Sequence, residues 1–538
     1  MVVNSAREAY DYARTLALAY VAVKIFSFLR RIGLNPRGLI KAIGSTLLSG
    51  AGAVLPGNVV GGLVKAAVKK EIEGIEKELL GDGDPDARTR VPEVGLNARD
   101  VINSAKAQKE LQKGFADGIK WGGIYHDENK NGGDHLGEVQ HTLWKLFNNS
   151  NLLYPDVFPG IRKFEAEVTE MVLSMVGGGD GKAVGLLSSG GTESILIAVL
   201  AYREKARSMG IAEPEIVCAI TAHPALYKAC KYFNVKLVKV GVDASTGYQL
   251  SPKAAEAHIT RSTVAIYASA PTFTHGVMDP VEDLAKLAQR RNVGLHVDNC
   301  LGGFLTSYLQ KAGLMNKRFD FSVEGVTTMS IDVHKYGFAS KGVSVVCFRD
   351  PALRQLTYVP SVDGCEGLYV TPTLQGSRPG GVVAQAWGTL LCVGESGYLS
   401  FAKRYHAMVQ KVKDVLSQIP ELELLVEPDA ACVPISSSEK AISIYQVATL
   451  MEKKGWNMFT GQHPPVMTLC LGEQHLRVLD RWGDDLVASV QTLRENPNVK
   501  LDGHAAVYGA AATVPDDILD AVLRSYVDVR MRVKPKKA

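Results

Sequence analysis

The sequence has few cysteines, and they form no recognisable pairs. Its 538 residues include eight cysteines, which are scattered without any C-x-x-C spacing. That distribution argues against a structural zinc site and against a disulfide framework, so we expect no bound metal. Several cysteines stand in apolar runs such as residues 344–348. We therefore expect buried, reduced thiols in a reducing compartment.

An excess of charge of one sign is also missing. The formal net charge is only +4, with 46% hydrophobic and 22% charged residues, which is ordinary for a globular protein. Nucleic-acid binding would need a concentrated basic stripe, so we expect no nucleic-acid partner. The basic residues between 530 and 537 are more simply a solvated, frayed end. A single core rarely grows to this length, which predicts more than one domain.

No run near the N-terminus matches a full membrane-spanning helix. Residues 15–29 are apolar except for Lys24, but a spanning helix needs about 20 apolar residues. Residues 42–64 carry no charge and are long enough to span, but they are rich in glycine and not very hydrophobic. Acidic residues near the start disfavour a cleaved secretory signal. Two predictions stay open for this region: a membrane-anchoring segment, or a helical arm that packs on a partner subunit.

Through the middle of the chain, short apolar runs alternate with helical patterns. Continuous apolar strands separated by helices predict a mostly parallel sheet that is covered on both faces. The expected strands are residues 183–187, 215–220, 236–242, 264–269, 293–297, 326–331 and 343–348. From about residue 381 the pattern indicates helices with short strands, and thus a smaller α+β domain. We expect an N-terminal helical region over 1–95, the main α/β domain over 96–380 and a small C-terminal domain over 381–538.

A lysine stands directly after one expected strand, in the run Asp332-Val333-His334-Lys335-Tyr336-Gly337. A lysine amine has a reference pKa of about 10.4, and it must lose its proton to attack a carbonyl. Burial and a neighbouring cation would lower that pKa. The commonest reason to place a lysine at the mouth of an α/β sheet is a Schiff base with pyridoxal 5′-phosphate (PLP). By itself, however, Lys335 fits a surface lysine better.

Two further features fall at the carboxyl ends of expected strands, where α/β sheets bind ligands. Asp298 can keep the ring nitrogen of PLP protonated, or it can simply cap a helix or turn. The run of residues 188–194 joins a strand to a helix, and its glycines let backbone N–H groups approach a phosphate. The phosphate contacts would be Gly190, Gly191 and Thr192. The alternative is a Gly-rich turn with a capping box.

His223 follows another strand and can stack on the cofactor ring, although by itself it is more simply a capping or core histidine. The order of features decides between these alternatives. A phosphate loop, a stacking histidine, a strand-end aspartate and the His-Lys pair all fall at strand carboxyl ends. This combination predicts an α/β, fold-type I PLP enzyme of the aspartate aminotransferase-like class. It would have a large mostly parallel-sheet domain, a small C-terminal α+β domain and a helical N-terminal arm.

These residues resemble the sphingosine-1-phosphate lyase family from roughly residue 100 to the end. The motifs are residues 154–160, 189–196, 275–280, 296–298, 301–304, 332–337 and 376–381. Single motifs such as the Gly-Gly-Thr loop are shared with amino-acid decarboxylases, whereas the combination is specific to the lyases. The resemblance implies PLP-dependent retro-aldol cleavage of the C2–C3 bond in phosphorylated long-chain bases. The products would be a fatty aldehyde and phosphoethanolamine.

The resemblance also implies catalytic roles. Lys335 would hold the cofactor covalently and transfer protons, with His334 beside it. Tyr125 matches the family's active-site tyrosine and would act as a general acid/base. Asp298 would bind the ring nitrogen, and His223 would stack on the ring.

Phosphate groups would be bound at two places. The cofactor phosphate would contact two subunits, through Gly190, Gly191 and Thr192 of one and Gly376 and Ser377 of the other. Lys341 matches the family's contact to the substrate phosphate. Many family members have a histidine where this chain has Tyr154, and a phenol carries no positive charge. Phosphate recognition would then depend more on Lys341.

The family's homodimers share active sites, and eukaryotic members are anchored in the endoplasmic reticulum membrane with the catalytic domain in the cytosol. Residues 15–29 sit where that anchor would be; a mitochondrial or soluble cytoplasmic location is the alternative. Two other functions stay open: an amino-acid decarboxylase, and a non-catalytic membrane-tethered scaffold. Degenerate scaffolds usually lose the Schiff-base lysine or the aspartate, and this chain keeps both Lys335 and Asp298.

Overall fold

The computed structural model describes residues 73–77, 79–84, 87–112, 117–127, 135–179, 181–365, 367–438, 442–501 and 516–535. The two N-terminal stretches considered above, residues 15–29 and 42–64, lie outside these ranges. Within the described ranges, no helix combines the length and the apolar character needed to cross a membrane.

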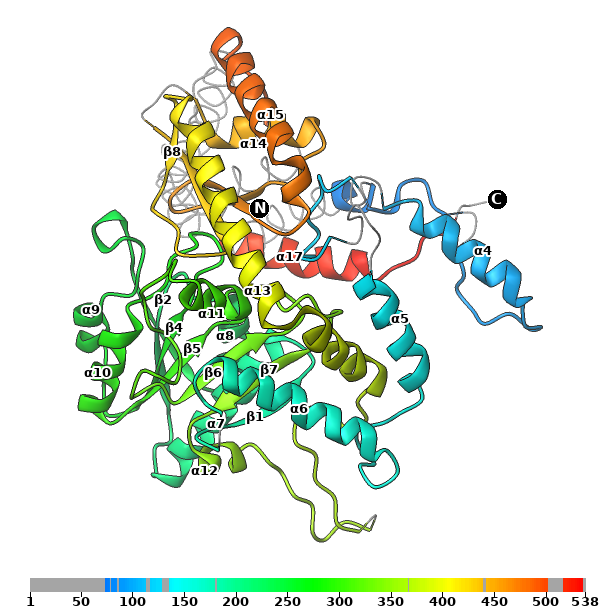
Figure 1. Ribbon diagram of the computed structural model, residues 1–538, viewed down its shortest axis with the longest axis vertical. Coiled ribbons are helices and arrows are strands. Elements are labelled where there is room, and N and C mark those ends of the chain that lie inside the picture. The colour runs from blue at the N-terminus through cyan, green and yellow to red at the C-terminus, as the bar shows by residue number, and fades with distance from the viewer. Residues whose placement is uncertain are drawn as a thin grey trace, which may run out of the picture. The chain divides into compact units, whose positions relative to one another are not determined.

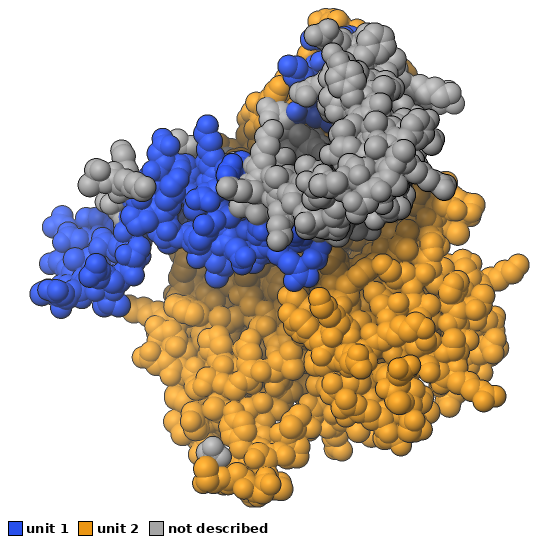
Figure 2. All heavy atoms as spheres, turned by 180° about the vertical axis from the view of Figure 1, so that it is seen from behind, with its two compact units in different colours: residues 1–112, 496–538 blue, residues 113–495 orange. Residues whose placement is uncertain are grey.

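The chain forms two compact units, one of residues 1–112 with 496–538 and one of residues 113–495 (Figure 2). The first unit contains α4 (Ala98–Lys109) and α17 (Asp516–Arg530). A parallel bridge between Asp84 and Pro535 joins its N-terminal and C-terminal parts. The division of the chain at residues 95 and 380 stays a prediction.

The second unit is built on a seven-stranded sheet with the order β1-β7-β6-β5-β4-β2-β3 (Figure 1). Its strands are β1 (Val184–Ser188), β2 (Glu215–Ala219), β3 (Lys236–Val240), β4 (Thr263–Ser269), β5 (Gly294–Asp298), β6 (Thr328–Asp332) and β7 (Ser344–Phe348). The strands from β3 to β6 run parallel, whereas β7 runs antiparallel to both of its neighbours, β1 and β6. The predicted mostly parallel sheet is therefore confirmed.

Helices cover the sheet because its central strands are apolar on both faces. Strands β2, β4, β5, β6 and β7 are buried at every position. Helix α7 (Gly191–Ser208) packs on β4, β6 and β7, and α10 (Val281–Arg291) packs on β4 and β5. Every residue of α7 from 193 to 202 is buried, as expected of a helix that is apolar all round. The other helices are α5 (His135–Phe147), α6 (Pro159–Met175), α8 (Pro224–Phe233), α9 (Pro252–Ala257), α11 (Gly303–Lys311) and α12 (Pro351–Gln355).

The C-terminal part of this unit contains a second, smaller sheet. Its four antiparallel strands have the order β10-β11-β9-β8, which confirms the predicted α+β architecture. They are β8 (Leu422–Leu424), β9 (Cys432–Ser437), β10 (Phe459–Gly461) and β11 (Val466–Cys470), accompanied by α14 (Ile444–Lys453) and α15 (His475–Glu495). The long helix α13 (Gly380–Ser417) precedes them. It is interrupted at Gly394, whose φ of 59° favours glycine.

Candidate active site

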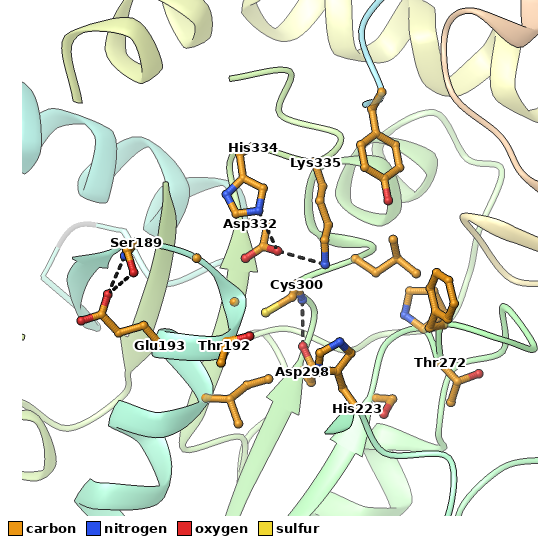
Figure 3. A pocket seen from close by; sticks show the side chains of 18 of the residues that line it. Ser189, Thr192, Glu193, His223, Thr272, Asp298, Cys300, Asp332, His334 and Lys335 are labelled. Carbon is orange, nitrogen blue, oxygen red and sulfur yellow. Dashed lines mark hydrogen bonds and ion pairs between the residues drawn. The ribbon is translucent and has the colours of Figure 1, made fainter. Parts of the chain in front are cut away.

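A cavity of about 490 Å³ opens at the carboxyl ends of the strands of the large sheet (Figure 3). Ser189, Ser269, Asp298 and Asp332 line it from the ends of β1, β4, β5 and β6. Parallel α/β sheets bind ligands at this edge. The predicted site residues that line the cavity are Tyr125, Gly190, Gly191, Thr192, His223, Asp298, His334 and Lys335.

Lys335 forms an ion pair with Asp332, three positions before it in the chain. The distance from Lys335 Nζ to Asp332 Oδ2 is 3.0 Å, and Asp332 is buried. Burial alone would lower the pKa of Lys335, but the negative charge of Asp332 raises it above its ordinary value. The expectation of a lowered pKa is therefore wrong for the free amine, because its neighbour is a carboxylate and not a cation. Asp332 holds a proton on Nζ until the amine reacts.

His334 completes this cluster from the other side of Asp332. Its Nε2 lies 3.4 Å from Asp332 Oδ2, while its Nδ1 accepts the backbone N–H of Val343 at 3.2 Å. The Val343 contact requires a lone pair on Nδ1, so the proton of the neutral ring is on Nε2, facing Asp332. Burial lowers the pKa of His334 below its ordinary value. His334 therefore stays neutral near pH 7 and orients Asp332 without adding a charge.

Asp298 ends β5, and both of its oxygens accept hydrogen bonds. Oδ1 accepts the backbone N–H of Cys300 at 3.0 Å and the hydroxyl of Ser330 at 3.2 Å, and Oδ2 accepts the hydroxyl of Tyr267. Burial alone would raise the pKa of Asp298, but nearby His223 and these hydrogen bonds hold it below its ordinary value. A charged carboxylate therefore sits on the cavity wall.

The loop from β1 to α7 presents the helix N-terminus to the cavity. Gly190 caps α7 with a φ of 154°, which favours glycine. At Gly191, an added Cβ would lie 2.7 Å from Cys300 Sγ and 2.8 Å from Asp332 Oδ1, so a side chain does not fit. Glu193 accepts hydrogen bonds from both the N–H and the hydroxyl of Ser189, at 2.7 and 2.6 Å. Glu193 thus bonds to Ser189, the residue before the N-cap, and no side chain caps α7 itself. Gly190, Gly191 and Thr192 line the cavity, where the helix N-terminus favours an anion.

His223 and Tyr125 lie on the cavity wall. His223 is the N-cap of α8, and its Nδ1 accepts the N–H of Ala225 at 3.1 Å. It therefore caps a helix and also faces the cavity beside Asp298 (Figure 3). Tyr125 is buried, and burial raises the pKa of its hydroxyl well above the ordinary value. Tyr125 is accordingly a neutral phenol that can donate a proton.

Four predicted contacts do not line this cavity: Lys341, Tyr154, Gly376 and Ser377. Lys341 is exposed; its ammonium lies 5.5 Å from the ring centre of Tyr125 and donates to the carbonyls of Gly123 and His334. Tyr154 is 52% exposed. Asn151 lies between the Tyr154 and Ser377 segments, because it accepts the N–H of Tyr154 and donates to Ser377 Oγ.

Several cavity residues were not foreseen from the sequence. Asp332 lay inside the recognised His-Lys run but had no assigned role, although its place at a strand end was a signal. Trp121, Thr272, Phe273 and Cys300 also line the cavity. Tyr267 reaches Asp298 from the neighbouring strand, and no local pattern indicated it. Among the described residues, no group of three or more side chains could hold a metal ion.

The residues present fit PLP. A covalently attached cofactor needs an amine for its aldehyde, a carboxylate for its ring nitrogen and an anion site for its phosphate. Lys335, Asp298 and the N-terminus of α7 supply these three in one cavity (Figure 3). The missing Cβ at Gly191 lets this loop pack closely against Cys300 and Asp332 on the cavity wall.

Comparisons with known proteins agree with this arrangement. The model of the pyridoxal-dependent decarboxylase conserved domain matches residues 142–436. Sphingosine-1-phosphate lyase 1 of Mus musculus is 37% identical over 466 residues, which cover 85% of this chain and 80% of that protein.

Two solved structures extend the comparison. A sphingosine-1-phosphate lyase of Burkholderia pseudomallei has a TM-score of 0.71 and 32% identity, covering 76% of this chain and 94% of its own. The glutamate decarboxylase of Lactobacillus brevis has a TM-score of 0.65 over 76% of this chain and 95% of its own. At 17% identity, that second likeness shows the fold alone.

Proposed function

The chain belongs to the sphingosine-1-phosphate lyase family, and we propose that it cleaves phosphorylated long-chain bases at the C2–C3 bond. This retro-aldol cleavage yields a fatty aldehyde and phosphoethanolamine. The main support for this proposal is that Lys335 and Asp298 line the same cavity. The chain that contains them is 37% identical over 466 residues to a sphingosine-1-phosphate lyase. The enzyme is a PLP-dependent carbon–carbon lyase.

Each side chain of the cavity has a task in this reaction. When bound, PLP withdraws electrons from the carbon–carbon bond that breaks. Lys335 binds the cofactor through Nζ and then moves protons at the substrate carbon, while Asp298 holds a proton at the ring nitrogen. Gly190, Gly191 and Thr192 bind the cofactor phosphate. Because burial raises the pKa of Tyr125, its hydroxyl stays protonated near neutral pH and can donate a hydrogen bond to the substrate.

Lys341 is the residue that we assign to the substrate phosphate. Its ammonium donates to two backbone carbonyls, and in the described part of the chain it forms no ion pair with a carboxylate, so its positive charge is available to an anion. Burial and repulsion by Lys335 lower the pKa of Lys341 to about 8. Lys341 is therefore cationic below about pH 8 and neutral above it.

The KM for a phosphorylated base is expected to rise above about pH 8, because Lys341 loses its charge there. Replacement of Lys341 by Met should raise KM by about 10- to 100-fold with little change in kcat, as expected from a lost hydrogen bond to a charged group. Lys341→Arg is the matched control, because a guanidinium stays charged throughout this range. If KM of the arginine variant still rises near pH 8, another group titrates and the assignment fails.

A homodimer with shared active sites is a further part of the proposal. The segment after α12 extends away from the sheet (Figure 1). It carries exposed apolar side chains. They are Val359, Val362, Leu368, Tyr369, Val370 and Leu374. Ser361 and Tyr369 pair across this arm in an antiparallel bridge. An exposed apolar patch next to Gly376 and Ser377, which do not line their own cavity, suits contact with a second copy.

Leu368, which is 84% exposed, tests this dimer. Leu368→Asp would bury a charge in the interface, so we expect the dimer to dissociate and activity to fall with it. Light scattering coupled to size-exclusion chromatography reports the mass. Leu314→Asp, at an exposed leucine outside the arm, should leave the mass unchanged. A monomeric wild type, or a Leu368→Asp dimer of unchanged stability, would contradict the proposal.

We also propose attachment to the endoplasmic reticulum membrane through residues 15–29, with the catalytic unit facing the cytosol. The apolar character of that run supports it, and Lys24 can extend toward the lipid headgroups. A mitochondrial or soluble cytoplasmic location is the alternative. Carbonate extraction of the expressed full chain separates these outcomes: recovery in the soluble fraction would refute membrane attachment.

The proposed reaction is tested by assaying long-chain aldehyde and carbon dioxide in parallel. Purified full-length protein is loaded with PLP and given sphingosine 1-phosphate in one reaction and amino acids in the other. Aldehyde without carbon dioxide is expected. Carbon dioxide from an amino acid without aldehyde would identify a decarboxylase instead. Neither product from protein that binds PLP would support the non-catalytic scaffold.

A further inference from the structure

A tyrosine stands behind Asp298, on the strand next to it. Tyr267 lies in β4, directly opposite His296 of β5 in the parallel register, and Asp298 is two residues further along β5 on the same face. The hydroxyl of Tyr267 donates to Asp298 Oδ2. Tyr267 is 2% exposed and does not line the cavity, so it touches neither cofactor nor substrate directly.

The Tyr267 hydroxyl can act on Asp298 only as a donor. Burial, followed by repulsion from Asp298, raises the pKa of this phenol well above its ordinary value, so the proton stays on Tyr267. A buried hydroxyl without a partner is destabilising, and the carboxylate is the acceptor that Tyr267 has. The tyrosine ring is also fixed, because it stacks on His296 at 5.2 Å between ring centres.

The neighbouring histidine cannot replace this donor. Burial lowers the pKa of His296 to about 4, so it is neutral near pH 7. Its two ring nitrogens lie 2.8 Å from Thr328 Oγ1 and 3.2 Å from Ser330 Oγ, and neither contacts Asp298. The donors to Asp298 are therefore the Cys300 N–H and the Ser330 hydroxyl on Oδ1, and Tyr267 on Oδ2.

The shared proton of an aspartate and a pyridine nitrogen can rest on either partner. Each hydrogen bond donated to the carboxylate stabilises its charged form and so favours the proton on nitrogen. Only the protonated ring withdraws electrons strongly. Oδ1 already accepts two hydrogen bonds, which leaves Oδ2, the oxygen bound by Tyr267, with the free lone pair for the ring N–H.

We propose that Tyr267 is a positioning residue that keeps Asp298 charged, so that the proton of the Asp298–cofactor pair stays on the ring nitrogen. Tyr267 acts through Asp298 and is not a catalytic residue itself. The inference deepens the proposed function by naming a residue that sets the strength of the electron sink. It depends on PLP binding and not on which substrate is cleaved.

The test is Tyr267→Phe, which removes one oxygen and keeps the ring that stacks on His296. The full chain is loaded with PLP that carries ¹⁵N in its ring, and the nitrogen chemical shift is measured by NMR without substrate. We expect the shift to move toward that of neutral pyridine. With substrate, kcat should fall by about 10- to 100-fold at nearly constant KM, as expected for one lost hydrogen bond to a charged group.

Tyr445→Phe is the matched control. Tyr445 is also a buried tyrosine, in α14, and its hydroxyl donates to the carbonyl of Gly461 at 2.8 Å and not to Asp298. It should lose a comparable amount of folding stability and keep the wild-type ¹⁵N shift. A wild-type shift in Tyr267→Phe would overturn the proposal and leave Tyr267 a packing residue. If the ¹⁵N shift changes in Tyr267→Phe but the wild-type protein forms no aldehyde, the role of Tyr267 is supported and the proposed substrate is wrong.

Discussion

Replacing Lys335 by arginine is expected to lower kcat by about a thousandfold or more, because in the proposed mechanism Lys335 both binds the cofactor and moves protons. Among the described residues that line the cavity, Lys335 is the only lysine, so we expect no other amine there to take its place. Borohydride reduction should attach PLP permanently to the wild-type chain and not to the variant. Mass spectrometry of the peptide that contains residue 335 measures this directly.

Arginine is a more informative replacement for Lys335 than alanine, because it keeps a positive charge beside Asp332. Lys335→Ala would leave the buried Asp332 carboxylate without its cation, and breaking a buried ion pair costs about 3–5 kcal/mol. An inactive alanine variant could therefore simply be unfolded. A guanidinium keeps a positive charge beside Asp332 but is not a nucleophile at neutral pH. Activity within tenfold of wild type in Lys335→Arg, or borohydride labelling at another lysine, would contradict the assignment.

Replacing Asp298 by asparagine should lower kcat by about 10²- to 10³-fold, which is typical when one buried electrostatic partner of a transition state is removed. The amide has the same shape but no charge, so the ring nitrogen loses its protonated form. Absorbance of the bound cofactor and kcat are measured on protein with equal PLP content. Lys335 still carries the cofactor, so borohydride labelling should persist.

Asp279→Asn is the matched control for this variant. Asp279 is another buried aspartate, in the loop between β4 and α10, and its carboxylate accepts the N–H groups of Leu250 and Ser269 at 2.7 and 2.8 Å. In the asparagine variant, the side-chain NH₂ group would point at one of these N–H donors and could not accept its hydrogen bond, so folding stability should fall. Because Asp279 does not line the cavity, kcat per bound cofactor should stay near wild type. Equal losses of kcat in both variants would mean that Asp298 acts only through stability.

Local sequence patterns predicted many of the residues that line the cavity, because of the way α/β sheets are built. A helix returns the chain from the end of one parallel strand to the start of the next, so strand carboxyl ends gather at one edge. Asp298, Lys335 and the loop at Gly190 could therefore be assigned to one cavity without knowing the strand order. The fold class followed from the same alternation of buried strands and helices.

Contacts across the sheet were beyond the reach of those patterns. Strand β7 lies between β1 and β6 and runs antiparallel to both. Its apolar sequence has the same pattern as the sequences of the parallel strands, so the pattern could not indicate its direction. Tyr267 meets Asp298 over 31 positions of sequence, and only the pairing of β4 with β5 brings them together. The pKa of Lys335 was expected to fall because the turn that folds its amine back onto Asp332 was not foreseen.

The sequence by itself determined the mostly parallel sheet, the cofactor class and the meeting of Lys335, Asp298 and the Gly190 loop in one cavity, because these depend on local periodicity and on residue types at strand ends. Tertiary structure alone decided the charge states of those residues: Asp332 keeps Lys335 protonated, and Tyr267 helps to keep Asp298 ionised. The physical reason is that a pKa depends on burial and on charges a few ångströms away. Those neighbours come from strands whose order the local pattern leaves open.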